Sequence, residues 1–298
     1  MLKKIELINS LINESVTVES CIYDGILLTY FEDGQVEAEF TKYKGVNQYG
    51  QSISKTSLSE RPIKLNGTIL ADNREQIEIL KKQLVRVLNP LQDVLLKYNT
   101  EYIHKEITIR AEHIPRFSTT FETNNDLALA FQCSFNAAYP FWMDQDENVT
   151  NIETWEGGIE FELEIPGDGV EFARRGLNEL EIINYGDIYS PVEIFFSGPA
   201  LNPSISIANS NTKEQIFIKV NKQIKEGETL YISTAYGSRK VEIIKDDIKE
   251  NAFNYIDLKS TISLFNLEVG RNILRYSTEG DFLPQSVIIK YKNKYLSL

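Results

Sequence analysis

The feature that most constrains the fold of this chain is the stretch 182–243, where short apolar runs alternate with turn signals. Within each run, apolar residues recur at every second position, which is the spacing of a strand with one buried face. The runs lie about ten residues apart with Asn, Gly and Pro between them, which predicts an antiparallel sandwich or jelly roll. The apolar positions are Val192, Ile194 and Phe196; Ile205 and Ile207; Ile216, Ile218 and Val220; Leu230 and Ile232; and Val241 and Ile243.

The mixture of elements along the chain predicts two domains. With 298 residues, the chain is longer than a usual single domain. Its first half combines strands with one convincing helix, whereas its second half is almost entirely strand-like. We therefore expect an α+β domain over residues 1–145 and an all-β sandwich over residues 155–298. The acidic and polar segment 143–151 is the expected boundary.

One helix is predicted over residues 73–88. Asn73 followed by Gln76 fits a capping box at its start, and Pro90 follows its end. In the strand predicted after it, residues 127–139, mostly large apolar side chains alternate with small or polar ones along the whole length. Such long alternation implies that one face of the strand packs under the helix.

Residues 43–61 form a polar segment that is punctuated by glycine and poor in aliphatic side chains. A segment of this composition cannot bury a core of its own. We therefore expect it to project from the first domain as an extended arm or long hairpin.

Composition excludes several classes of partner. The formal net charge of −12 argues against specific binding to nucleic acid, which depends on clustered Lys and Arg. No apolar run approaches the roughly 18 residues of a membrane-spanning helix, so no membrane partner is expected. The first residues lack the pattern of a secretory signal, so we expect assembly in the cytoplasm of the producing cell.

The cysteines indicate neither a metal site nor a disulfide framework. Only Cys21 and Cys133 are present, without a CxxC motif or a suitably spaced His. Cys133 falls on the apolar phase of its strand and is expected to be a packed thiol.

Candidate catalytic groups are sparse, so we expect no catalytic residue and no cofactor. His104 lies opposite the apolar positions of its strand and His113 lies at a strand end, so both are interpreted as exposed or structural. The chain contains no GxSxG, SxxK or P-loop motif. The Gly-Asp-Gly sequence at 167–169 is interpreted as a tight turn between strands.

An acidic group near two tryptophans leaves a glycoside hydrolase open as an alternative, because such enzymes use two carboxylates that flank a sugar. The group lies in the predicted boundary rather than on rigid strands, and chance clustering is expected among 43 acidic residues. Farther on, Glu160, Glu162 and Glu164 alternate with apolar residues and are interpreted as the solvent face of a strand. The acidic group consists of Asp144, Asp146, Glu147, Glu153 and Glu156, beside Trp142 and Trp155.

Sugar binding without catalysis is a second alternative, because jelly-roll sandwiches often present aromatic side chains to sugars. Tyr185, Tyr189 and Tyr236 lie in or near predicted loops of the second domain. Their rings suit a sugar or a protein partner equally well.

The order of several motifs along the chain is informative. The polar arm, RPIKLNGTI, the helix and a strand ending in AYPFW are followed by a series of turns and by LFNLEVGRNILRY. The marked positions are Arg61, Gly67, Pro140, Phe141, Trp142, Asn184, Gly186, Pro191, Gly198, Asn202, Pro203, Gly227, Glu228, Gly237, Gly270 and Asn272. Their order resembles the two-domain plan of distal tail proteins of long-tailed phages, across nearly the whole chain.

The resemblance implies a structural protein of the virion tail tip, or of a phage-tail-like particle. Six copies would form a ring, with a second domain that is similar to galectins or carbohydrate-binding modules. The implied partners are further copies, the tail tube protein, the tape-measure protein, the tail-associated hub protein and receptor-binding proteins. The arm would lie on a neighbouring copy and contact it through Val46, Tyr49, Gln51, Ile53 and Leu58.

A function of another class stays open beside this one. A carbohydrate-binding module attached to an oligomerisation domain would mediate adhesion to the host cell wall through the tyrosines of the second domain.

Overall fold

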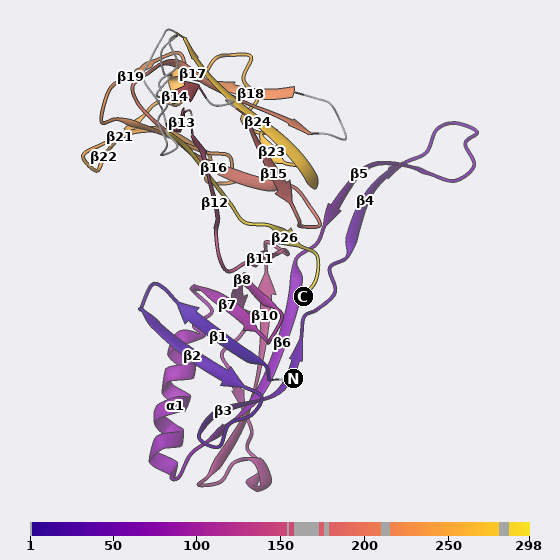
Figure 1. Cartoon of the computed structure of the whole chain (residues 1–298). Helices are drawn as coiled ribbons and strands as arrows, with labels where there is room; N and C mark the ends of the chain where they lie inside the picture. Colours follow the sequence, from indigo (N-terminus) through magenta and orange to yellow (C-terminus); the bar gives the residue numbers. More distant parts are fainter. Residues whose placement is uncertain (1, 154, 158–172, 176–178, 210–214, 280–285) are drawn as a thin grey trace. The chain divides into compact units, whose positions relative to one another are not determined.

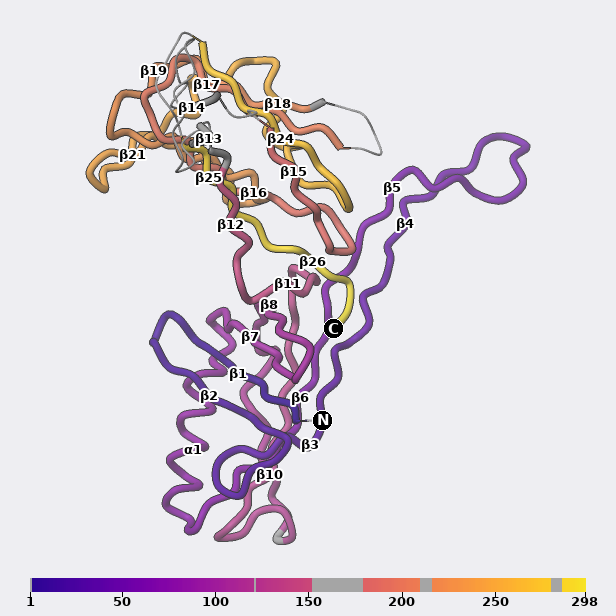
Figure 2. The backbone as a smooth tube through the Cα atoms, viewed as in Figure 1, coloured from indigo at the N-terminus to yellow at the C-terminus, as the bar shows by residue number. Residues whose placement is uncertain are grey.

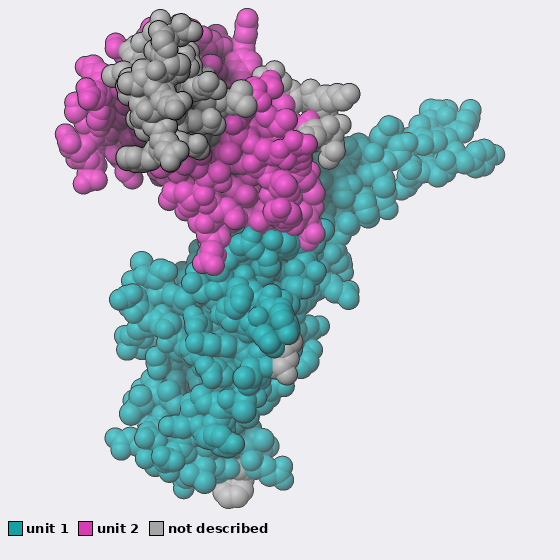
Figure 3. Space-filling model, in the orientation of Figure 1, with its two compact units in different colours: residues 1–145, 295–298 teal, residues 146–294 magenta. Residues whose placement is uncertain are grey.

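The computed structural model describes residues 2–153, 155–157, 173–175, 179–209, 215–279 and 286–298. Two compact units divide the chain: unit 1 holds residues 1–145 and 295–298, and unit 2 holds residues 146–294 (Figure 3). Strands dominate both units, and the described residues contain one α-helix. The predicted strand-rich chain with a single long helix is confirmed. Unit 1, however, is a mainly β structure with one helix beside a closed barrel, so the expected α+β class describes it only in part.

Seven strands of unit 1 close into a barrel. They are hydrogen-bonded in the order β8-β7-β1-β2-β3-β6-β10, and β10 returns to β8 through the pairs Phe135–Ala111 and Asn136–Arg110. All neighbouring pairs are antiparallel except β2 with β3. The strands are β1 (Lys4–Asn9), β2 (Glu14–Glu19), β3 (Gly25–Glu32), β6 (Arg61–Leu70), β7 (Asp93–Asn99), β8 (His104–Ala111) and β10 (Ala128–Ala137).

Alternate residues of these strands fill the barrel. On β10, the predicted apolar phase is buried, including Phe131, Cys133 and Phe135 at 1 to 2% exposure. Burial raises the pKa of the Cys133 thiol to about 12. Gly67 on β6 lies opposite Phe131, where an added Cβ would come within 2.7 Å of the ring, so only glycine fits there.

The helix α1 (Arg74–Val87) covers β1, β2 and β6 (Figure 1). Its cap is the predicted one, because the Asn73 side chain accepts a hydrogen bond of 3.0 Å from the Gln76 amide. Ile77, Leu84 and Val87 are fully buried and belong to the same core as the barrel strands. No helix in the described part of the chain is both long and apolar enough to cross a bilayer.

Three short strands extend the barrel sheet: β9 (Arg116–Phe117) beside β10, β11 (Trp142–Asp144) beside β8, and β26 (Lys294–Tyr295) next to β11. The Tyr295 hydroxyl lies 3.4 Å from Asp144 Oδ2, and Lys105 Nζ lies 3.2 Å from the centre of the Tyr295 ring. Residues 295–298 therefore belong to unit 1, whereas the sequence pattern assigned them to the second domain.

Between β3 and β6 the chain leaves the barrel as a separate two-stranded sheet, β4 (Ala38–Tyr43) and β5 (Ser52–Leu58), which we call the arm (residues 38–58). The arm extends away from the barrel (Figure 2). A hairpin is thus present where the sequence predicts one, but its first strand begins before residue 43. None of its strand residues is buried.

Unit 2 consists of two larger antiparallel sheets that share one core. All the predicted apolar groups fall on strands, namely β16, β17, β18, β20 and β21, with Val220 directly after β18. One sheet contains β12 (Asn148–Glu153), β25 (Ser286–Tyr291), β16 (Ser190–Ser197), β20 (Thr229–Ser233), β21 (Lys240–Lys245), β22 (Ile248–Asn251) and β23 (Asn266–Leu267). The other contains β15 (Glu179–Asn184), β24 (Gly270–Glu279), β17 (Ala200–Asn209), β18 (Gln215–Lys219) and β19 (Gln223–Ile224), and β13 (Trp155–Gly157) pairs separately with β14 (Ala173–Arg175).

Candidate functional site

The arm has two chemically different faces, because directly paired residues of an antiparallel ladder share a face. On the apolar face, Lys42 Nζ lies 5.5 Å from the centre of the Phe40 ring. The pairs on this face are Ala38 with Leu58, Phe40 with Thr56 and Lys42 with Ile53. The polar face carries Glu39, Thr41, Tyr43, Ser52, Lys55 and Ser57.

The apolar face of the arm is open to solvent. Phe40 is 47% exposed and Ile53 is 55% exposed. A two-stranded hairpin with nothing packed on it is at best marginally stable in water. Apolar side chains gathered on such an open face are typical of a surface that another polypeptide covers.

The loop at the tip of the arm is shaped by its own polar groups. Gln48 Oε1 accepts a hydrogen bond of 2.8 Å from the Gly45 amide, and Gln48 Nε2 donates to Ser52 Oγ at 2.8 Å. Val46 and Tyr49 are not used in this network and are 97% and 100% exposed. Their side chains are therefore presented to solvent by an ordered turn.

The predicted contact residues all lie on the arm. Val46, Tyr49 and Gln51 are on its tip, whereas Ile53 and Leu58 are on the apolar face of β5. Phe40 lies on the same exposed face, and the sequence analysis did not include it because it placed the start of the arm at residue 43. The alternation of apolar Phe40 with polar Glu39 and Thr41 is the sequence signal that could have identified it.

The root of the arm is fixed by Arg61, whose side chain is 2% exposed. Its Nε donates to the Pro140 carbonyl at 2.8 Å, and its Nη1 donates to the carbonyls of Asp33 and Gly34 at 3.1 Å. Its Nη2 donates to the Leu296 carbonyl. One guanidinium group thereby ties together the residues before the arm, Pro140 between β10 and β11, and the segment 295–298.

The carboxylate of Asp33 completes this cluster. It forms an ion pair with Arg61 Nη1 at 3.1 Å and accepts a hydrogen bond of 2.6 Å from Trp142 Nε1. Burial raises the pKa of Asp33, although the Arg61 charge and the bond from Trp142 act in the opposite direction. Next to it, Gly34 has φ +64 and an added Cβ would overlap the Pro62 carbonyl, so the two ends of the arm are in backbone contact.

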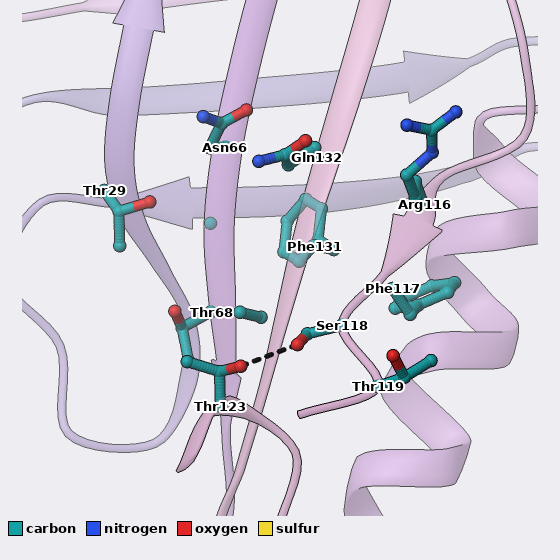
Figure 4. A pocket seen from close by; sticks show the side chains of 12 residues that line it. Thr29, Asn66, Thr68, Arg116, Phe117, Ser118, Thr119, Thr123, Phe131 and Gln132 are labelled. Atoms are coloured by element: carbon teal, nitrogen blue, oxygen red, sulfur yellow. Dashed lines mark hydrogen bonds between the residues drawn. The ribbon is translucent and has the colours of Figure 1, made fainter. Parts of the chain in front are cut away.

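A polar pocket of about 460 Å³ lies on the wall of unit 1 formed by β3, β6, β10 and β9 (Figure 4). Asn66 and Gln132 line it, together with a hydroxyl pair in which Ser118 Oγ lies 2.6 Å from Thr123 Oγ1. Arg116 is the only charged residue of its lining. The lining can hydrogen-bond a polar group, but it offers no acid and base pair for catalysis.

The three candidate tyrosines of unit 2 are exposed. Tyr185 is 72%, Tyr189 is 51% and Tyr236 is 87% exposed. The Val192 amide donates to Thr234 Oγ1 at 2.9 Å, which brings the segment before β16 and the loop after β20 to the same end of unit 2. The rings therefore share one end of the unit, where a sugar or a protein could reach them.

A tight turn holds Tyr185 outward. Asn184 is 2% exposed, its Nδ2 donates to the carbonyls of Ile188 and Leu267 at 2.9 Å, and its Oδ1 accepts from the Gly186 amide at 2.8 Å. A Cβ added to Gly186 would come within 2.4 Å of the Lys294 carbonyl oxygen. Packing and hydrogen bonding therefore require Asn184 and Gly186, which gives a physical reason for two of the marked positions.

The acidic group does not form a pair of free carboxylates where it is described. Asp144 pairs with Lys105 at 2.6 Å, and Glu147 pairs with Lys290 at 3.1 Å. Trp142 is fully buried and so cannot serve as an exposed platform. The other predicted features lie outside the described part of the chain. The side chains of Glu153, Trp155 and Glu156 are not described. Neither are Glu160, Glu162, Glu164 and the turn at 167–169.

Both histidines are exposed and engaged with neighbours. His104 Nδ1 lies 3.0 Å from Asn99 Oδ1, and His113 Nδ1 lies 2.9 Å from the Ile114 carbonyl oxygen. Within the residues that the structure describes, no group of three or more His, Cys, Asp or Glu side chains is placed to hold a metal ion.

Two protein-family models match the chain. The one described as siphovirus-type tail component, C-terminal domain, matches residues 186–295. The one described as phage tail protein RIFT-related domain matches residues 25–137. No curated protein matches the chain.

Solved structures of phage proteins are similar over the full length. The Dit protein (gp 19.1) of phage SPP1, described as a paradigm of the hub adsorption apparatus in phages that infect Gram-positive bacteria, has a TM-score of 0.62 at 14% identity, over 98% of this chain and 99% of that chain. A chain of the phage P2 baseplate in its activated conformation with Ca has a TM-score of 0.58 at 12% identity, over 100% of both chains. At these identities the likeness concerns the fold.

Proposed function

The chain belongs to the siphovirus-type tail component family as a distal tail protein, and from this premise we propose that its copies form a closed ring at the tip of the phage tail. The ring joins the tail tube to the apparatus that adsorbs to the host. Six copies is the number that the family resemblance implies. The matching family models and structures are of tail and baseplate proteins, which supports a structural role rather than an enzymatic one.

The arm is the observation that carries this proposal. Its apolar face is exposed in the single chain, and its direction is set by the buried Arg61 at its root. A projecting surface and its acceptor lie at different places on one subunit, so each contact is of the head-to-tail kind. Such contacts satisfy every subunit only when the rotation closes into a ring. The arm would gain its cover when it lies on the next copy.

The other partners follow from the same premise. We propose the tail tube protein, the tape-measure protein, the tail-associated hub protein and receptor-binding proteins as neighbours in the virion. Assembly would take place in the cytoplasm of the host, before the tail tip joins the finished particle.

Light scattering after size exclusion tests the ring. The full chain is expected to elute as a species of about 205 kDa, six times 34.1 kDa, with a central hole in negative-stain images. Deletion of residues 44–60 is expected to give a folded monomer with unchanged circular dichroism of the barrel and sandwich. Rings that persist in the deletion variant would refute the role of the arm.

The carbohydrate-binding alternative is favoured by one observation, the three exposed tyrosines at one end of unit 2. Binding of the full chain to a glycan array, lost in Tyr185→Ala and Tyr236→Ala but kept in Tyr23→Ala, would support it. Tyr23 is the matched control because it is 97% exposed and lies in unit 1.

A further inference from the structure

A concavity lies at the seam where the barrel of unit 1 closes. Two strands share one edge of β8, since β11 pairs with Lys105 and Glu106 and β10 pairs with Arg110 and Ala111. Between these contacts the two strands diverge, and a pocket of about 500 Å³ opens beside Ile109. We call it the seam pocket.

The seam pocket joins an apolar wall to unpaired carboxylates. Its open apolar lining is formed by Ala138 and by Tyr139, whose ring meets Phe141 edge-on at 5.0 Å, whereas the side chains of Ile109 and Ala111 belong to the barrel core behind it. Glu60 and Glu112 stand at its rim, are exposed, and have no ion-pair partner among the described residues. Arg110 also lines the pocket, but its charge is paired with Asp93 at 2.7 Å, so the two free carboxylates leave the rim suited to a further cation.

A second polar group in the pocket also lacks a partner. Asn136 lines the pocket, and its Oδ1 is buried without a hydrogen-bond donor in the described part of the chain. A buried acceptor of this kind is destabilising until a donor reaches it. The amide torsion is soft, so a donor in the pocket can be met by a small rotation.

The arm carries the complementary groups. It is a basic segment of an acidic chain, with Glu39 as its one acid and with Lys42, Lys44 and Lys55. None of these lysines has a carboxylate partner in the described structure. Beside Lys44 on the tip, Tyr49 is fully exposed and offers an aromatic ring with a hydroxyl donor.

The arm cannot fill the pocket of its own chain. The six residues of β4, from Ala38 to Tyr43, span about 20 Å, and the tip lies beyond them. The arm leads away from the barrel (Figure 2), whereas Glu60 at the rim lies two residues after the end of β5, at the root. The occupant must therefore come from a second copy of the chain.

We propose that the seam pocket of each copy receives the arm tip of the next copy. The Tyr49 ring enters beside Ala138 and Tyr139, and its hydroxyl donates to Asn136 Oδ1. Lys44 pairs with the carboxylates of Glu60 and Glu112 at the rim. This inference rests on the proposed ring and names the surface that closes it.

The first test truncates the aromatic anchor. Tyr49→Ala is expected to weaken self-association of the full chain about thirtyfold in sedimentation equilibrium, the effect of removing an interfacial anchor residue. Tyr23→Ala, an equally exposed tyrosine of unit 1, is the control and should change the constant less than twofold. Equal constants for the Tyr49→Ala variant and the unaltered chain would overturn the proposal.

The second test reverses charges on the two sides of the contact. Lys44→Glu alone, and Glu60→Lys with Glu112→Lys, should each abolish rings. Mixing the two proteins should restore rings, because an alternating ring pairs each altered arm with an altered pocket and each original arm with an original pocket. Lys55→Glu, on the polar face of the arm, is the charge-matched control and should assemble normally.

The outcomes separate this inference from the ring itself. If deletion of residues 44–60 abolishes rings while Tyr49→Ala and the charge variants assemble normally, the ring stands and the seam pocket is not its acceptor. If the deletion variant still forms rings, or if the unaltered chain does not self-associate, both proposals fail. Failure of the mixture to form rings, with each variant folded by circular dichroism, overturns the seam pocket alone.

Discussion

The barrel and the arm of unit 1 are made of strands with the same alternating pattern, yet they differ completely in burial. On β10 every second residue is buried, whereas on β4 and β5 none is. Backbone pairing alone thus does not tell a stable sheet from one that needs a partner. The distinction lies in what covers the apolar face, which is the barrel interior in one case and solvent in the other.

The barrel side of this comparison predicts the largest effect. Phe135→Ala removes a ring that is 1% exposed and should lower the free energy of unfolding of unit 1 by about 3–5 kcal/mol, as large-to-small changes in cores do. Urea denaturation followed by tryptophan fluorescence of Trp142 would measure it. A loss below about 1 kcal/mol would mean that the barrel interior is not close-packed there.

Arg61 lies at the border between the two regions and predicts a somewhat smaller effect. Arg61→Met keeps the volume but removes the ion-pair partner of Asp33 and leaves several carbonyl groups without their donor, which should cost roughly 3 kcal/mol. Because the root is then loosened, proteolysis within the arm should also become faster. Arg61→Lys should restore part of the stability but not the bonds to all four carbonyl groups, and a full rescue would show that charge alone matters.

On the arm side, stability and assembly should separate. Ile53→Ser replaces a residue that is 55% exposed, so the free energy of unfolding should change by less than about 0.5 kcal/mol. The ring, measured by light scattering, should nevertheless weaken because the apolar face loses an anchor. A drop in stability comparable to that of Phe135→Ala would show that the arm is packed in the isolated chain.

The smallest expected effect concerns the two cysteines, one buried in the barrel and one exposed. Cys133 is buried with its pKa raised to about 12, so it stays a neutral thiol at pH 8, whereas Cys21 is exposed. A thiol reagent should therefore label one cysteine in the native chain and two in urea. Labelling of Cys133 in the native state at the rate of Cys21 would indicate that β10 opens readily.

Local signals explain what the sequence could predict. The Asn73 cap, the alternation of β10 and the strands of unit 2 all depend on neighbours in the sequence, and each is found where the pattern indicates. The assignment of ring formation to unit 1, by contrast, stays a prediction. The contact role of the arm residues and of the three tyrosines also stays a prediction.

Long-range contacts explain what was missed. The barrel closes through only two residue pairs between β10 and β8, and no periodicity marks them. Asp33 meets Trp142 across 109 positions of sequence, so its role at the arm root could not be inferred from its surroundings. Tyr295 belongs to unit 1 and contacts Asp144. The segment 295–298 is too short for its residue pattern to indicate this contact.

The bond between Arg61 and the Leu296 carbonyl also has a consequence for biosynthesis. The two residues are 235 positions apart, so a ribosome that adds 5–20 residues per second makes the acceptor on the order of tens of seconds after the donor. Throughout that interval the nascent arm has an incomplete root. Translation itself therefore delays the moment at which the root of the arm is complete until residues 295–298 have been made.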